Sequence, residues 1–243
     1  MIVAGNWKMN LELESIESFI KVFAKNYKKE KVSSEVIFLP PYPFISLLAN
    51  SFSEKKISIG AQNVHFENNG PYTGQISAPM LSSLNCKYVL IGHSEYRNVD
   101  NEKISERIKI SIKNNLTPIL CCGESIEIKK EKKTLDFLKD QLDTATNLLS
   151  DDEVQKIIIA YEPIWSIGTG SLPINEEIKN IIYFIKDYLN KKNNSDQRVL
   201  YGGSCNEKNV KNLSSIENLD GFLIGGASTN PESFFEILKQ IEV

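Results

Sequence analysis

Residues 157–170 read IIIAYEPIWSIGTG, an apolar run that ends in one carboxylate and continues into a proline and two glycines. The run Ile157–Ala160 lacks polar alternation, which is typical of a strand covered on both faces in a parallel sheet. Glu162 follows where such a strand would end. Gly168 and Gly170 leave neighbouring backbone N–H groups open, and such groups can bind an anion. The stretch predicts a buried strand that carries an acid at its end, beside an anion-binding loop.

Short apolar runs of this kind recur along the 243 residues. The predicted strands are Ile2–Trp7, Val36–Leu39, Ile57–Ala61, Tyr88–Ile91, Thr117–Cys121, Ile157–Tyr161, Val199–Tyr201 and Phe222–Ile224. Amphipathic helical patterns lie between them, at Leu13–Lys28, Glu102–Asn115, Leu135–Leu149 and Glu176–Leu189. Asn230-Pro231-Glu232 predicts the start of a last helix.

Eight strand–helix units in one chain of this length favour the α/β class and an eight-stranded (β/α)8 barrel, whose units average about 30 residues. No linker or charge block divides the sequence, so we expect one domain over residues 1–243. A doubly wound open sheet is the alternative. It would need fewer strands, and no G-x-G-x-x-G turn follows the first predicted strand.

Composition argues against several classes of protein. The net charge is −3, and the lysine doublets lie among glutamates, which indicates solvated helix faces and no nucleic-acid-binding surface. No apolar stretch reaches the ~18 residues of a membrane span, and no signal peptide precedes the first strand. The few cysteines and histidines give poor support to a metal site. The cysteines are expected to be reduced thiols in the cytoplasm. These residues are Cys86, Cys121, Cys122, Cys205, His65 and His93.

Polar or glycine-rich segments follow five of the predicted strands. In a (β/α)8 barrel the carboxyl ends of the strands form one mouth, where chemistry is carried out. The loops after strands seven and eight of such barrels commonly bind phosphate through backbone N–H groups. A small substrate with a phosphate group fits best. The five segments are Asn6-Trp7-Lys8, His93-Ser94-Glu95, Glu162, Gly202-Gly203-Ser204 and Gly225-Gly226.

Six motifs, in order from the first strand to the last, resemble those of the triosephosphate isomerase family. The resemblance implies a TIM barrel that interconverts dihydroxyacetone phosphate and glyceraldehyde 3-phosphate without a cofactor, in glycolysis and gluconeogenesis. The motifs are Gly5-Asn6-Trp7-Lys8, Tyr72-Thr73-Gly74, Ile91-Gly92-His93-Ser94-Glu95, Cys122-Gly123-Glu124, Ala160–Gly170, and Tyr201-Gly202-Gly203-Ser204 with Gly221–Ala227.

The resemblance also implies roles for individual residues. Glu162 would be the base that moves a carbon-bound proton, and His93 a neutral electrophile that donates to the substrate oxygens. Lys8 would supply a fixed positive charge to the phosphate and the developing oxyanion. Asn6 would hold the substrate oxygens. Glu95 is similar to an acid beside this lysine, with either a structural or a proton-relaying role.

The segment from Pro163 to about Pro173 resembles the family's lid. Its closure would bring the Gly168 N–H onto the phosphate and exclude water. Ser204, Gly225 and Gly226 would complete the phosphate site. Exclusion of water matters because an enediolate phosphate exposed to water eliminates its phosphate.

The motif at 72–74 resembles the tip of a loop that inserts into a partner subunit beside that subunit's active site. Thr73 is thus expected to support Asn6 and Lys8 of the other chain in a homodimer. Where the family usually has a glutamate and often an arginine, this chain has Gln75 and Tyr96. We expect Tyr96 to pack near Gln75 of the other chain.

Two further departures concern the lid and a cysteine. Pro173 occupies a position whose backbone N–H, in the family, receives the hydroxyl group that matches Tyr201. Proline has no N–H. Lid closure should therefore depend on other contacts, for example Ser204 with Gly170. Cys122 replaces an aliphatic residue next to Cys121, and both thiols are expected to be buried and inert.

Two other functions stay open at this point. Another phosphate-binding barrel isomerase would share the glycine-rich loops after strands seven and eight, but not this arrangement of Lys8, His93 and Glu162. A noncatalytic binding protein on the same fold would be favoured by loss of a catalytic residue, and the expected residues are all present.

Overall fold

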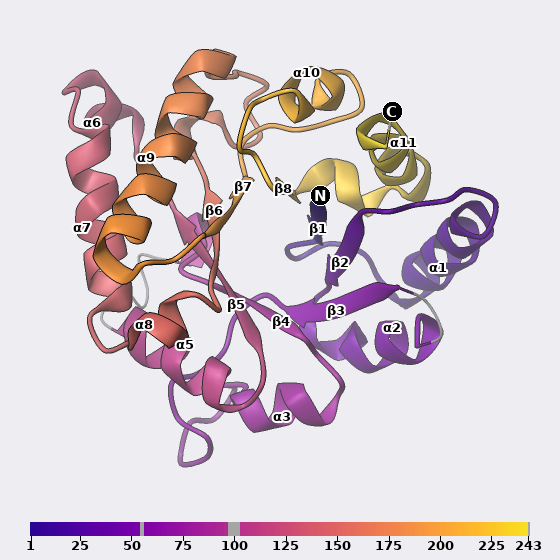
Figure 1. Ribbon diagram of the computed structural model, residues 1–243. Helices are drawn as coiled ribbons and strands as arrows, with labels where there is room; N and C mark the ends of the chain where they lie inside the picture. The colour runs from indigo at the N-terminus through magenta and orange to yellow at the C-terminus, as the bar shows by residue number, and fades with distance from the viewer. Residues whose placement is uncertain (54–55, 97–102, 243) are drawn as a thin grey trace.

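Eight parallel strands close into a barrel in the computed structural model, which describes residues 1–53, 56–96 and 103–242 (Figure 1). Each strand pairs with the next in the chain, and β8 returns to β1 with Ile2 opposite Gly221. The strands are β1 (Ile2–Asn6), β2 (Glu35–Leu39), β3 (Ile57–Ala61), β4 (Tyr88–Ile91), β5 (Thr117–Cys122), β6 (Ile158–Tyr161), β7 (Arg198–Tyr201) and β8 (Gly221–Ile224). The predicted (β/α)8 TIM barrel is confirmed, and no predicted strand end differs by more than one residue.

Helices surround the barrel, as Figure 1 shows. The long predicted helices are confirmed with shifted ends; Glu102, the first residue predicted for one of them, lies outside the described residues. Short helices at residues 45–51, 78–83, 126–130, 151–154 and 210–214 were not predicted. The helices are α1 (Leu13–Tyr27), α2 (Ile45–Ser51), α3 (Ala78–Ser83), α5 (Ile104–Lys113), α6 (Ile126–Lys130), α7 (Thr134–Thr146), α8 (Asp151–Val154), α9 (Asn175–Asn193), α10 (Val210–Ser214) and α11 (Pro231–Ile241).

The predicted start of the last helix has the expected chemistry. The Asn230 side-chain oxygen accepts a hydrogen bond from the Ser233 N–H at 2.8 Å, and Pro231 occupies the first turn, where its missing N–H costs nothing. No helix in the described part of the chain is long and apolar enough to cross a bilayer.

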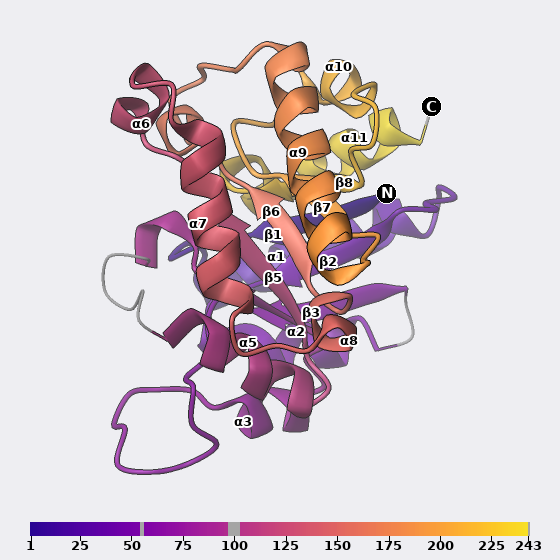
Figure 2. The same ribbon diagram turned by 60° about the vertical axis from the view of Figure 1, so that its left-hand side comes forward.

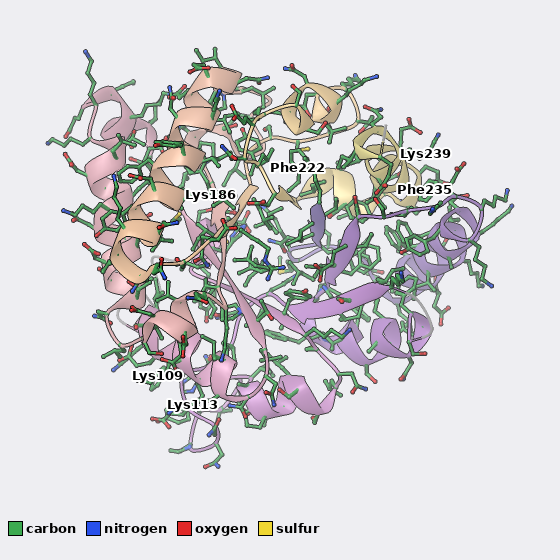
Figure 3. All side chains as sticks on the ribbon, viewed as in Figure 1. Lys109, Lys113, Lys186, Phe222, Phe235 and Lys239 are labelled. Atoms are coloured by element: carbon green, nitrogen blue, oxygen red, sulfur yellow. The ribbon has the colours of Figure 1, made fainter. Side chains whose placement is uncertain are left out.

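The apolar core has two layers because successive strand residues point alternately into and out of the barrel. The outer layer lies between sheet and helices and includes Phe222 on β8 and Phe235 on α11, both labelled in Figure 3. The barrel interior is filled by Ile2, Ala4, Ile37, Leu39, Tyr88, Leu90, Ile119, Cys121, Ile158, Ala160, Leu200 and Leu223.

An aromatic cluster in the outer layer anchors the segment that follows β1. The Trp7 ring packs edge-on against Phe19 at 4.8 Å between centroids and against Phe38 at 5.6 Å. The indole N–H donates to the Ser228 carbonyl oxygen at 2.9 Å, so the polar atom of this buried ring is satisfied. The cluster therefore holds the backbone on either side of Trp7 in a defined position.

Polar side chains close the amino-terminal end of the barrel. The Tyr88 hydroxyl donates to the Glu35 carboxylate, which also lies 3.9 Å from an Arg198 guanidinium nitrogen. Burial, and then the bond to Glu35, raise the pKa of the Tyr88 hydroxyl. This end is packed and polar only at its rim.

The last residues of α11 are tied to the loop before β2 at the same end. Glu242 accepts hydrogen bonds from the Ser34 N–H at 2.7 Å and from the Ser33 hydroxyl. Burial alone would raise the pKa of the Glu242 carboxyl, but these hydrogen bonds outweigh it and hold the pKa at about 2. The Glu242 carboxylate therefore links the end of the last βα unit to the end of the first one.

Candidate active site

A cavity of about 370 Å³ opens at the carboxyl ends of the strands. It is lined by residues from the segments after β1, β4, β6, β7 and β8, which are far apart in sequence and meet because the barrel is closed. The structure brings eight of the predicted site residues together on its walls: Asn6, Lys8, His93, Glu162, Gly168, Ser204, Gly225 and Gly226. Three other predicted residues, Glu95, Thr73 and Tyr201, do not line it.

Glu162 follows β6 directly, and its side chain is only 2% exposed. One carboxylate oxygen, Oε1, lies 3.1 Å from Nε2 of His93, and the other, Oε2, accepts a long hydrogen bond from the Ser94 N–H at 3.3 Å. Its backbone N–H donates to the Cys122 carbonyl oxygen at 2.7 Å, which continues the β5–β6 ladder. The acid is thus held at the end of a buried strand.

The hydrogen bonds of His93 assign its proton. Nδ1 accepts a hydrogen bond from the Glu95 N–H at 3.3 Å, so Nδ1 is unprotonated and Nε2 carries the hydrogen. Helical backbone begins at Ser94, immediately after the ring. In this tautomer the Nε2–H is directed at the Glu162 carboxylate.

Lys8 has a left-handed backbone, with φ of 52°. This conformation costs a non-glycine residue of the order of 1–3 kcal/mol and requires support from its surroundings. The Lys8 N–H donates to the Asn6 side-chain oxygen at 3.0 Å, and its carbonyl oxygen accepts from the Gln62 amide at 2.8 Å. The ammonium lies 2.6 Å from a Glu95 carboxylate oxygen. Asn6 and Gln62 hold the strained backbone, and Glu95 orients the charge.

Trp165 lies near the start of the predicted lid, which begins at Pro163, and its ring is held from two sides. The indole N–H donates to Oε1 of Glu124 at 2.8 Å, and the Lys129 ammonium lies 3.9 Å from the ring centroid. Glu124 is fully buried and also accepts from the Tyr161 hydroxyl at 3.2 Å. Burial raises the pKa of the Glu124 carboxyl, and the bond from Trp165 opposes that rise. These contacts fix the first stem of the lid, residues 163–167, which leads to the tip at 168–170 and the second stem at 171–173.

The tip of the lid is exposed and depends on glycine. Gly168 and Gly170 have φ values of 70° and 75°, in the left-handed region that side chains disfavour. Neither N–H donates to another described residue. Both groups are therefore able to turn toward a ligand in the cavity that they line.

Tyr201 and Ser204 make contacts that differ in part from the expected ones. The Tyr201 hydroxyl is buried and makes no hydrogen bond of ordinary geometry in the described structure; burial raises its pKa to about 12, and an interaction with the Ser166 side chain opposes that rise. The Ser204 hydroxyl donates to the Ser166 carbonyl oxygen at 2.6 Å, and the expected contact of Ser204 with Gly170 in the closed lid stays a prediction. The lid is joined to the loop after β7 through its stem.

Two glycines leave room for the acid. A Cβ atom on Gly123 would lie 1.7 Å from the Glu162 carbonyl oxygen, and one on Gly202 would lie 2.8 Å from the Glu162 Cγ. The Gly123 N–H donates to the Gln141 side-chain oxygen at 2.9 Å. The positions on both sides of β6 therefore have to be glycine for Glu162 to occupy its site.

A second cavity, of about 270 Å³, adjoins the first and shares Asn6, Lys8 and His93 with it. Glu95, Gln75 and Tyr96 line it as well, so the last two lie at one cavity within a single chain. Thr73 is exposed on the loop between β3 and α3, which projects away from the barrel (Figure 2, lower left).

The remaining expectations concern thiols and metals. Cys121 and Cys122 are each 1% exposed, as predicted. Among the described residues, no three His, Cys, Asp or Glu side chains form a group that could hold a metal ion.

Sequence reasoning missed Gln62, Trp165, Glu124 and Lys129 as working parts of the site. Gln62 follows β3 directly, so its place at a strand end was an available signal. Glu124 and Trp165 stand within quoted motifs, but their contact joins residues 41 positions apart, and no local pattern shows it.

Comparison with known proteins places the whole chain in one family. A family model described as triosephosphate isomerase matches residues 1–241. The triosephosphate isomerase of Cytophaga hutchinsonii is 40% identical over 246 residues, which cover 98% of each chain. That of Buchnera aphidicola subsp. Cinara cedri is also 40% identical, over 98% of this chain and 97% of its own. The crystal structure of triosephosphate isomerase from Bartonella henselae superimposes with a TM-score of 0.86 at 31% identity, covering 100% of this chain and 99% of that one.

Proposed function

This chain belongs to the triosephosphate isomerase family, and on that premise we propose which of its residues carry out the reaction. The protein is an aldose–ketose isomerase that interconverts dihydroxyacetone phosphate and D-glyceraldehyde 3-phosphate, a step of glycolysis and gluconeogenesis. The observation that carries the assignment is the meeting of Glu162, His93 and Lys8 at one cavity. We treat residues 1–243 as one domain, of which Val243 lies outside the described residues.

Glu162 is the proposed base. Its carboxylate removes the proton from the carbon next to the substrate carbonyl, and the electron pair moves to form an enediol(ate). The same carboxyl group then returns the proton to the neighbouring carbon, which turns ketose into aldose or the reverse. The buried position limits exchange of this proton with water.

His93 is the proposed electrophile. Its Nε2–H now points at Glu162, and the substrate oxygens would take over this hydrogen bond. That exchange would free the carboxylate and stabilise the negative charge that develops on oxygen. The Glu95 N–H at Nδ1 keeps the ring in the tautomer that this step requires.

Lys8 and backbone N–H groups are the proposed anion site. The ammonium attracts the phosphate and stabilises the oxyanion, and Asn6 holds the substrate oxygens. Gly225, Gly226 and Ser204 line the far side of the cavity, where N–H groups can surround the phosphate. Gly168 would complete this site when the lid closes.

A homodimer is the proposed assembly, with Thr73 of each chain inserted beside the active site of the other. The projecting loop offers the segment to be inserted, and the second cavity offers a receiving site that reaches Asn6 and Lys8. Met9, 96% exposed beside that cavity, would be covered. Mass measurement in solution tests this: one chain weighs 27.5 kDa, and a monomer at micromolar concentration would contradict the proposal.

The cytoplasm is the proposed compartment. All four cysteines are buried and none is in a disulfide, which is usual in a reducing environment.

A turnover assay on glyceraldehyde 3-phosphate tests the proposed roles. Glu162→Gln keeps the shape of the side chain and removes the base, so kcat should fall by at least ~10²–10⁴-fold. Glu236→Gln, on the outer helix α11, is the matched control and should retain full turnover. A loss of less than tenfold in Glu162→Gln would remove the base assignment.

A further inference from the structure

Ser166 lies at the centre of a ring of hydrogen bonds within the lid. Its side chain is fully buried, and its hydroxyl donates to the Ser171 carbonyl oxygen at 2.5 Å, which joins the first stem of the lid to the second. Thr169 braces the ring from inside: its hydroxyl oxygen lies 3.2 Å from the Ser166 carbonyl oxygen and accepts from the Ser171 N–H at 3.1 Å. Residues 166–171 are thus cross-linked at both ends and in the middle.

The same residue connects the lid to the loop after β7. The Ser166 carbonyl oxygen accepts the Ser204 hydroxyl at 2.6 Å, and the Ser204 N–H lies 3.5 Å from the Ser166 hydroxyl oxygen. Ser204 is also a proposed phosphate-binding residue. One buried serine therefore contacts both stems of the lid and one wall of the cavity.

Pro173 and Tyr201 do not brace the second stem from outside the lid. Pro173 cannot donate a backbone hydrogen bond. The Tyr201 hydroxyl, buried behind the lid, makes no hydrogen bond of ordinary geometry in the described structure, and its polar interaction is with the Ser166 side chain of the first stem. The two stems are consequently joined by the direct bond from Ser166 to Ser171 and by the bonds of the Thr169 side chain to both residues.

We propose that the Ser166 hydroxyl is a positioning group for the isomerase reaction: it keeps residues 166–171 in one shape, so that the lid closes as a unit and presents the Gly168 N–H to the phosphate. The inference rests on the proposed function of the lid. Ser166 does not touch the reacting atoms. It acts through Gly168 and Gly170, whose left-handed backbones would be free to relax if the ring opened.

A loosened lid has a chemical signature. When water reaches the enediolate, the electron pair on oxygen reforms a carbonyl and shifts the carbon–carbon double bond as the C–O bond to the phosphate breaks. Inorganic phosphate leaves with the bonding pair, and no oxidant or reductant is consumed. The ratio of phosphate released to substrate isomerised therefore measures how well the closed lid excludes water.

Ser166→Ala is the test, with glyceraldehyde 3-phosphate as substrate and both products measured. The ratio of released phosphate to isomerised substrate should rise roughly fivefold, the effect expected from the loss of one buried hydrogen bond, while kcat falls by a similar factor. Ser171→Ala is the matched control, since it deletes a lid hydroxyl but keeps the accepting carbonyl oxygen. Ser166→Thr restores the hydroxyl and should return the ratio toward the wild-type value.

Each result decides whether Ser166 positions the lid for the reaction or only stabilises the fold. An unchanged ratio in Ser166→Ala overturns the proposal, even if kcat or the melting temperature falls, because a structural serine would lower activity without altering the partition. An equal rise in Ser171→Ala overturns it as well. If the wild-type enzyme did not isomerise the substrate at all, the proposed function would fail and the role of Ser166 would fail with it. Normal wild-type turnover with an unchanged ratio rejects the role of Ser166 alone.

Discussion

The two ends of this barrel are made from the same strands but have opposite properties. At the amino-terminal end, the Tyr88 hydroxyl on β4 donates to the Glu35 carboxylate, and the strands begin among packed side chains. At the carboxyl-terminal end, β4 leads to His93 and β6 to Glu162, and the strands open into a cavity of about 370 Å³. The comparison teaches that the same strand contributes to stability at its amino-terminal end and to catalysis at its carboxyl-terminal end. Substitutions at the two ends should therefore separate the two properties.

The largest effect is expected at the mouth, for His93→Gln. Glutamine can occupy the site but cannot supply the same Nε2–H, so kcat should fall by roughly 10²-fold or more. The melting temperature should stay within a few degrees of the wild type, because His93 adds little to the packed core. Steady-state kinetics with calorimetry measures both. Unchanged turnover, or a collapse of stability, would break the contrast between the ends.

Leu200→Ala in the filled interior should show the reverse behaviour. The side chain is fully buried, and its removal leaves a cavity that costs about 3 kcal/mol of unfolding free energy. Turnover per folded molecule at 25 °C should remain within about twofold of the wild type. Urea unfolding measures the first quantity and an assay well below the transition the second. A large fall in kcat would show that the interior also tunes the chemistry.

Lys8→Met should weaken substrate binding by charge alone. At low salt, KM should rise about tenfold above the wild-type value. The difference in KM between variant and wild type should become smaller at high salt, because salt screens the Lys8 ammonium of the wild type. The side chain is 23% exposed, so screening is only partial. Kinetics at two ionic strengths gives the result, and Lys21→Met on the exposed face of α1 is the control. A KM gap that does not depend on salt would point to packing instead of charge.

Glu242→Gln tests the amino-terminal end with a smaller change. The folded pKa of about 2 lies below the unfolded value of 4.5, so the carboxylate stabilises the fold above pH 4.5 and loses this effect as the pH falls toward 2. After allowance for solvent screening, the variant should lose about 1 kcal/mol at pH 7. The difference from the wild type should shrink between pH 4.5 and pH 3 in urea unfolding, with turnover unaffected. A constant difference across that range would assign the effect to shape.

Tyr201→Phe should have the smallest effect, although Tyr201 lies at the mouth. Its hydroxyl is buried and makes no hydrogen bond of ordinary geometry in the described structure, only an interaction with the Ser166 side chain, so its removal should cost little. Turnover should change by less than about twofold, and stability should stay level or rise. Kinetics and thermal unfolding check both. A large fall in kcat would mean that the hydroxyl finds a partner when the lid closes.

Much of the fold could be predicted because the strands are short, continuous apolar runs. Burial on both faces forces that composition, and the strand ends were located to within one residue. Short helices carry a weaker signal, as α8 shows. Ser150 and Glu153 form a capping box there, so the pattern was present, but the helix spans only four residues.

The site was predictable where its residues follow strands and match motifs, and not where it depends on contacts across the barrel. Lys8 could be named, but the Gln62 amide that holds its backbone acts over 54 positions. Ser166 was quoted in the opening stretch without a role, because its partners at 171 and 204 are set by the folded shape of two loops. Barrel register and loop conformation determine these pairs, and local sequence does not contain them.

The missing side chain at Gly123 limits how this enzyme can be redesigned. Even one methyl group there would lie 1.7 Å from the Glu162 carbonyl oxygen. Only a shift of the backbone that carries the base could remove this steric clash. Libraries that diversify the loop after β5 should leave this codon untouched and begin at Ser125. Variants with another residue at position 123 are expected to lose catalytic activity before they lose the barrel fold.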